Sequence, residues 1–149
     1  PVCLMHMQGI PETMQQKPDY PDVVEEVSGF LMARVEVCSA AGIGRDRILL
    51  DPGFGFGKTV EHNLQLLRHL DQLAARGYPL LVGLSRKSLI GKVLGLEVDK
   101  RLHPSIALAV LAVWQGASII RCHDVRETRE AVQMCQAVRD VDRFTAPAP

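Results

Sequence analysis

Short apolar runs and longer helix-like stretches alternate four times along the chain. Each apolar run leads into a glycine-rich or polar loop, and a stretch with helical periodicity follows. We predict strands over residues 2–7, 48–50, 79–83 and 118–121, and helices over residues 22–40, 61–76, 87–94, 105–115 and 125–140. Since parallel strands need a crossover connection, which is usually helical, this alternation predicts an α/β fold with a parallel sheet.

The residues that follow the predicted strands distinguish two architectures, an open doubly wound sheet and part of a (β/α)8 TIM barrel. In a barrel, the carboxyl end of every strand carries site residues. Here all four strand ends are polar or glycine-rich, which favours the barrel. A full barrel needs roughly 200 to 250 residues. We therefore expect residues 1–143 to form a half barrel of four βα units and residues 144–149 to be a disordered tail.

Charge and composition exclude several classes of function. Lys plus Arg and Asp plus Glu each number 17, so no net field attracts nucleic acid or an anionic membrane surface. No apolar run approaches the ~20 residues of a membrane span. The four cysteines lie far apart without a CxxC pair, so we expect reduced core residues of a cytoplasmic protein: Cys3, Cys38, Cys122 and Cys135. The opening at Pro1 is expected to be mid-domain sequence.

A glycine-rich loop over residues 51–59 follows the second predicted strand. It does not fit the phosphate-binding P-loop, because Pro52 stands where that motif needs its first glycine. The loop instead offers the Asp51 carboxylate at a strand end and glycines that let the backbone approach a flat ligand. The rings of Phe54 and Phe56 can form the walls of a pocket for that ligand. The alternative is a glycine-rich turn that Asp51 caps.

Cationic residues follow the third and fourth predicted strands. Arg86 and Lys87 precede a helix, whose first turn favours carboxylates, so two cations there indicate an anionic ligand. The alternative is that both are ordinary surface cations at the rim of the sheet, which bind no ligand. Arg121 and His123 lie two residues apart on an extended segment and so share a face, where they can hold a phosphate or pyrophosphate.

The sequence does not indicate a metal site or a nucleophilic serine. His62 and His69 lie two helical turns apart, too far to share one ion, so we predict no metal ligand in this chain. Ser85 is not in a nucleophile elbow, because Lys87 stands where the last glycine of G-x-S-x-G belongs.

The four strand ends together resemble dihydropteroate synthase, of the pterin-binding enzymes. The segments are CLMHMQG (3–9), LLDPGFGFGK (49–58), LVGLSRKSLIG (81–91) and IIRCHDVRET (119–128). The resemblance implies strands five to eight of the barrel. It also implies a cytoplasmic transferase of folate biosynthesis, which condenses 6-hydroxymethyl-7,8-dihydropterin pyrophosphate with p-aminobenzoate. The products are 7,8-dihydropteroate and pyrophosphate, magnesium assists, and sulfonamides occupy the p-aminobenzoate site.

The resemblance also implies roles for individual residues. Asp51 and Lys87 would hydrogen-bond the pterin, Met5 and Gly83 would line its slot, Arg121 and His123 would hold the pyrophosphate, and Phe56 and Ser85 would help to form the p-aminobenzoate site. Lys87, Arg121 and His123 are the expected catalytic set.

The first four strands of the family, with its metal-binding Asn, have no counterpart in the chain. We therefore expect the ligands of Mg²⁺ to come mainly from that absent half and from the substrate pyrophosphate. Because a half barrel exposes two strand edges, we expect two chains to pair as a homodimer, or the chain to be part of a longer enzyme. Two alternatives stay open: a pterin-binding methyltransferase that hands a folate methyl group to a cobalt cofactor, and a non-catalytic interaction module.

Overall fold

The computed structural model describes residues 1–14, 16 and 18–142. Strands and helices alternate along the chain: β1 (Val2–Met5), α1 (Val23–Ala40), β2 (Ile48–Asp51), α2 (Val60–Arg68), α3 (Leu70–Ala74), β3 (Leu81–Val82), α4 (Ser88–Leu94), α5 (Leu102–Trp114), β4 (Ile119–Ile120) and α6 (Val125–Arg139). Short 3-10 turns cover Arg45–Arg47 and Val98–Lys100. The α/β class is therefore confirmed, and the tail predicted over residues 144–149 lies outside the described residues.

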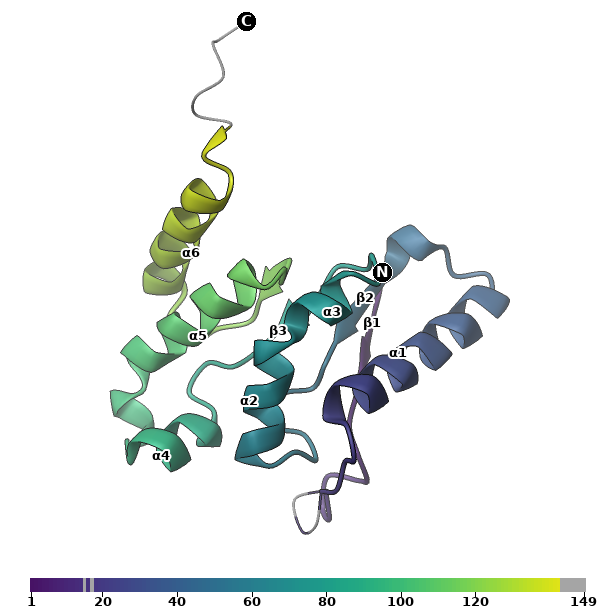
Figure 1. Cartoon of the computed structure of the whole chain (residues 1–149), viewed down its shortest axis with the longest axis horizontal. Helices are drawn as coiled ribbons and strands as arrows, with labels where there is room; N and C mark the ends of the chain where they lie inside the picture. The colour runs from purple at the N-terminus through teal and green to yellow at the C-terminus, as the bar shows by residue number, and fades with distance from the viewer. Residues whose placement is uncertain (15, 17, 143–149) are drawn as a thin grey trace, which may run out of the picture.

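The four strands lie side by side in chain order. β1 pairs in parallel with β2, and β3 pairs in parallel with β4. A parallel bridge between Leu50 and Leu80 joins the two pairs. The strand order does not reverse, as it does at the switch point of a doubly wound sheet. The helices follow the same order, from α1 at one side of the molecule to α6 at the other, and all four carboxyl ends share one edge (Figure 1).

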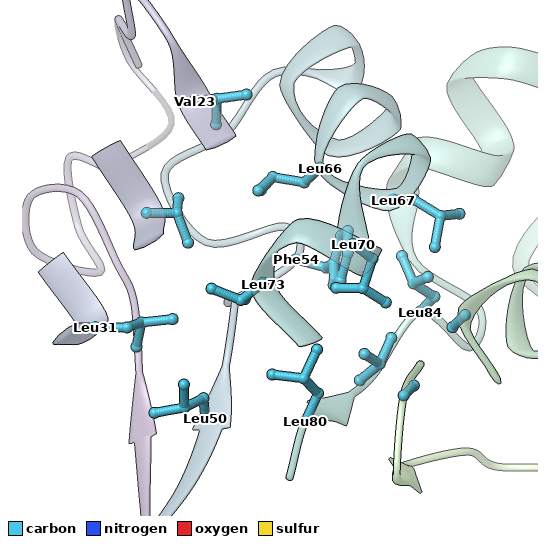
Figure 2. Packing of buried hydrophobic residues seen from close by; sticks show 14 of the residues in the cluster. Val23, Leu31, Leu50, Phe54, Leu66, Leu67, Leu70, Leu73, Leu80 and Leu84 are labelled. Carbon is cyan, nitrogen blue, oxygen red and sulfur yellow. The ribbon is translucent and has the colours of Figure 1, made fainter. Parts of the chain in front are cut away.

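The core lies between the sheet and the helices (Figure 2). Leu31 of α1, Leu50 of β2 and Leu80 before β3 are fully buried there. Side chains alternate between the two faces of a strand. The strand residues next to Leu50 and Leu80 therefore point to the other face of the sheet, away from the core. On that second face Met5 of β1 and Ile119 of β4 are each 39% exposed. The described sheet is thus covered by helices on one face and partly open on the other.

Several predicted element boundaries were wrong, among them the strand expected over residues 79–83, which covers only Leu81–Val82. The helix expected over residues 61–76 is two helices that meet at His69, whose ψ of 26° departs from helical geometry. The buried leucines keep their helical spacing across this break, so periodicity could not reveal it. The helix expected from Ser105 begins at Leu102, because Pro104 falls in the first turn, where its missing N–H removes no bond. The first strand ends at Met5 rather than residue 7.

The cysteines are all free thiols, as predicted, but the expectation that they are core residues holds only for Cys135. Cys38 and Cys122 are half-buried. Cys3 is exposed, because it lies on the open face of β1. Among the described residues, no helix combines the length and the apolar character needed to cross a bilayer.

Candidate functional site

Asp51, the last residue of β2, stands at the centre of the strand-end edge and is 8% exposed. The backbone N–H of Gly53 donates to Asp51 Oδ1 at 2.8 Å, so the carboxylate caps the loop, as one of the two interpretations predicted. A carboxylate has about four acceptor sites, of which this bond uses one. Burial raises the pKa of Asp51, while the Gly53 hydrogen bond and the charges of Lys87, Arg121 and Lys58 oppose that rise.

Lys87 approaches Asp51 from the end of β3. Its Nζ lies 4.4 Å from the centroid of the Phe56 ring, a cation–π contact. Gly55 makes the approach possible: its φ is +79°, and a Cβ there would lie 3.1 Å from Lys87 Cδ. Burial and the neighbouring Arg121 lower the pKa of Lys87, and Asp51 raises it. Lys87 therefore contacts the aromatic ring and interacts with the charge of the carboxylate.

Only one of the two aromatic residues of the loop can wall a ligand. Phe56 is half-buried and lies against Lys87, but Phe54 is 1% exposed within the core. The prediction that both would wall the site was wrong for Phe54. In an extended segment the two rings would share a face, but the positive φ of Gly55 between them turns them apart. Phe54 contributes its carbonyl instead, which accepts a hydrogen bond from Lys87 Nζ.

Arg121 and His123, which follow β4, complete the edge and are both exposed. A Cβ at Gly83 would lie 3.0 Å from Arg121 Nε and Nη2, so the glycine makes room for the guanidinium. His123 Nδ1 lies 2.9 Å from Ser85 Oγ, within hydrogen-bond distance. A cavity of about 100 Å³ is lined by Gly83, Ser85, Lys87, Arg121, Cys122 and His123. Five of the eight predicted site residues therefore meet at one cavity.

Two predicted residues differ in their relation to this cavity, with Met5 outside it and Ser85 within it. Met5 is opposite Asp51 in the β1–β2 register, so it borders the same edge. Ser85 contacts His123 rather than Phe56, so its polar group lies with the predicted anion pair. Within the residues that the structure describes, no three His, Cys, Asp or Glu side chains gather as a metal ion would need.

Arg86 does not face the cavity as a free cation. Its guanidinium forms a two-bond ion pair with Asp124, and its backbone N–H donates to Ser105 Oγ at 2.9 Å. The prediction that Arg86 and Lys87 both face an anion was therefore wrong for Arg86. Its φ of +56° is rare for a residue with a side chain, and the ion pair helps to hold it. The pair ties the loop after β3 to the loop after β4.

Sequence reasoning missed a buried pair beside the site. Lys58 is 3% exposed, and its Nζ lies 2.8 Å from Nδ1 of His6, which follows β1. Lys58 belongs to the loop that fails the P-loop pattern, and its residue type and spacing gave no other signal. Only the fold shows that residues 52 positions apart in the chain meet here.

Comparison with known proteins shows the family. The sequence model described as pterin binding enzyme matches residues 1–123. The chain belongs to the pterin-binding enzyme family. Dihydropteroate synthase of Escherichia coli (strain K12) is 52% identical over 137 residues, which cover 92% of this chain and 49% of that protein.

Solved structures agree with this assignment. Yersinia pestis dihydropteroate synthase in complex with a sulfonamide drug superposes with a TM-score of 0.92 at 51% identity, covering 95% of this chain and 52% of that one. The Xanthomonas albilineans enzyme in complex with 7,8-dihydropteroate gives a TM-score of 0.86 at 45% identity, covering 94% and 49%. The resemblance seen in the sequence motifs is thus confirmed. The chain spans about half the length of the relatives it matches.

The His6–Lys58 pair predicts a pH dependence of stability. Burial and the charge of Lys58 lower the pKa of His6 from 6.5 to about 4. Between these values the unfolded chain holds a proton that the folded chain does not, so stability rises with pH. We expect a gain of roughly 2 kcal/mol in the free energy of unfolding, after allowance for solvent screening. His6→Asn, which cannot titrate there, should lack this component.

Urea unfolding from about pH 4 to about pH 7 measures the effect. The raised pKa of Asp51 acts in the opposite direction, but it is common to both proteins and cancels in their difference. His103→Gln, a change at an exposed histidine of α5, serves as the control and should keep the wild-type slope. Parallel stability curves for wild type and His6→Asn would contradict the buried, neutral state of His6.

Proposed function

We propose that this chain is the C-terminal half of a dihydropteroate synthase, a cytoplasmic transferase of folate biosynthesis. Its reaction joins 6-hydroxymethyl-7,8-dihydropterin pyrophosphate to p-aminobenzoate. The observation that carries the proposal is the meeting of Asp51, Lys87, Arg121 and His123 at one sheet edge. Relatives 52% identical to the chain carry this enzyme's name, and relatives have been solved with a sulfonamide and with 7,8-dihydropteroate.

In the proposed complex, the pterin ring lies beside Asp51 and Lys87. The free acceptor sites of Asp51 would take two hydrogen bonds, from the 2-amino group and from the ring N–H, much as a carboxylate binds a guanidinium. Lys87 uses one N–H on the Phe54 carbonyl, so others remain for the pterin carbonyl and ring nitrogen. Met5 and Gly83 would border the slot. Burial of Asp51 strengthens such bonds, because few waters compete for the carboxylate.

Arg121 and His123 would hold the pyrophosphate. In the reaction the C–O bond to pyrophosphate breaks, and the leaving group takes the electron pair. The amine of p-aminobenzoate then forms the new C–N bond and loses a proton. Charge therefore develops on the departing oxygens, where Arg121 and His123 can stabilise it. Phe56, which lies against Lys87, would supply an aromatic wall for p-aminobenzoate. Ser85, which contacts His123, would also help to form the p-aminobenzoate site.

The described residues do not fit a magnesium site. Mg²⁺ prefers oxygen ligands, above all carboxylates and substrate phosphates. The cavity is lined instead by cationic and nitrogen groups of Lys87, Arg121 and His123, and Asp124 is paired with Arg86. A magnesium ion of the reaction would take its ligands from the pyrophosphate and from residues outside the described part of this chain.

We further propose that the four βα units are half of a (β/α)8 barrel whose open face is completed by further protein. The support is the chain-order sheet, together with the exposure of Met5 and Ile119 on its second face. For the isolated chain we propose a homodimer, with two copies covering each other's strand edges. Light scattering should then give the mass of two chains. A stable monomer that unfolds cooperatively would contradict the pairing.

Because Asp51 is proposed to hold the pterin ring and Arg121 the pyrophosphate, replacing each should cause a different binding defect. Asp51→Ala should abolish binding of the pterin ring, with or without pyrophosphate, because it removes the only carboxylate proposed to hold the ring. Arg121→Ala should weaken the pyrophosphate form by about tenfold, the effect of losing one charge-assisted bond of about 1.4 kcal/mol, and leave the plain pterin unaffected. Calorimetric titration of the chain with each ligand and Mg²⁺ measures both.

The exposed Arg126 of α6, which pairs only with Glu130 on its own helix among the described residues, provides a matched control. Arg126→Ala removes the same kind of side chain away from the cavity and should bind both ligands like the wild type. Equal loss of both ligands in Arg121→Ala would contradict the role proposed for Arg121.

A further inference from the structure

Lys58 is a buried cation for which the proposed reaction has no use. Its Nζ lies 2.8 Å from His6 Nδ1, 3.0 Å from the Gly53 carbonyl and 3.1 Å from the Phe56 carbonyl. Burial lowers the pKa of Lys58 to about 7, and the charge of Asp51 opposes that shift. In the ammonium form, which prevails below that pH, the group has three N–H donors, and these three acceptors use all of them. Lys58 is 3% exposed and is not among the residues that line the cavity with Arg121 and His123, whereas Lys87 is. Lys58 therefore acts on its own loop rather than on a ligand.

His6 is suited to accept this bond. Burial and the charge of Lys58 hold its pKa at about 4, so the ring is neutral at physiological pH. Its Nδ1 then accepts from Lys58, and the ring proton lies on Nε2. The ring packs edge-on against Phe30, with centroids 5.0 Å apart, and the His6 backbone N–H donates to the Asp51 carbonyl at 3.0 Å. His6 thus joins the end of β1 to the end of β2.

The glycine-rich loop lies directly against the segment that follows β1. A Cβ at Gly53 would lie 1.8 Å from the His6 carbonyl oxygen, and one at Gly57 would lie 2.6 Å from that of Gln8. The hydroxyl of Tyr20 donates to the Gly57 carbonyl at 2.7 Å. Glycine permits this close approach, but it supplies no side chain to fix the loop. Tyr20 and Asn63, which accepts from the Gly55 N–H, hold the loop from outside, and the Lys58 ammonium adds two bonds from inside it.

We propose that Lys58 is a positioning residue, which with His6 fixes the loop over residues 53–57 so that Phe56 and Asp51 are correctly placed for ligand. The inference rests on the proposed function, since it takes Phe56 and Asp51 as ligand-binding residues. Lys58 holds the backbone of Phe56 through its carbonyl, while Lys87 contacts the ring of the same residue. Lys58 also bonds the Gly53 carbonyl, and the N–H of Gly53 bonds Asp51. One ammonium thus contacts the backbone of Phe56 directly and that of Asp51's hydrogen-bond partner Gly53.

The first test removes the ammonium and keeps the length of the side chain. Lys58→Met should weaken binding of the pterin pyrophosphate by about tenfold, the effect of losing one bond to a charged group of about 1.4 kcal/mol. It should also move the NMR signals of the Lys87 side-chain methylenes in the unliganded chain, because they lose the ring-current field of Phe56. Lys100→Met removes an equally charged, exposed side chain and should change neither readout.

Two variants of His6 distinguish a positioning role of Lys58 from a general effect on stability. They also test the proposal if Lys58→Met does not fold. His6→Asn keeps an acceptor for Lys58 and should retain binding and the Lys87 signals. His6→Leu removes the acceptor and should reproduce the Lys58→Met defects.

The proposal is overturned if a folded Lys58→Met keeps wild-type binding and Lys87 signals, or if His6→Leu and His6→Asn behave alike. Should the wild-type chain bind no pterin pyrophosphate, the proposed function of this chain fails. The Lys87 signals of the unliganded variants then still decide the role of Lys58.

Discussion

The strands of the sheet pair in parallel and in chain order, and the site exists because of this pairing. Because each strand is followed by a helical crossover, all four carboxyl ends lie on the same edge of the sheet. Asp51, Lys87 and Arg121, each from a different βα unit, are thereby brought within electrostatic range of one another. Without that order, the polar residues after each strand would be separate loop residues with no shared chemistry.

At this edge several cationic side chains lie around the Asp51 carboxylate, and they differ in what they contact. Arg86 is neutralised by Asp124 and ties two loops together. Lys58 is enclosed by its own loop. Lys87 and Arg121 remain at the cavity, where we propose that Lys87 binds the pterin and Arg121 the pyrophosphate. The sequence shows these residues only as equivalent positive charges, and it is the fold that assigns them.

Local pattern predicted the α/β alternation, the strand-end residues and the meeting of Arg121 with His123. It failed where the outcome depends on distant contacts. The ring of Phe54 turns into the core because of the conformation of Gly55, and Arg86 finds Asp124 only once β3 and β4 are paired. The break at His69 leaves the apolar spacing unchanged, and the His6–Lys58 contact joins two ends of neighbouring strands. None of these has a signature in residue spacing.

If the strand ends of this chain form one binding site, a single ligand should perturb all of them. An amide NMR titration of the chain with the pterin pyrophosphate and Mg²⁺ measures this. We expect signals to shift together around Asp51, Lys87, Arg121 and His123, while those of the far ends of the helices stay unchanged. A well-folded chain in which no signals shift, or in which the shifts lie away from these four residues, would contradict a shared binding site.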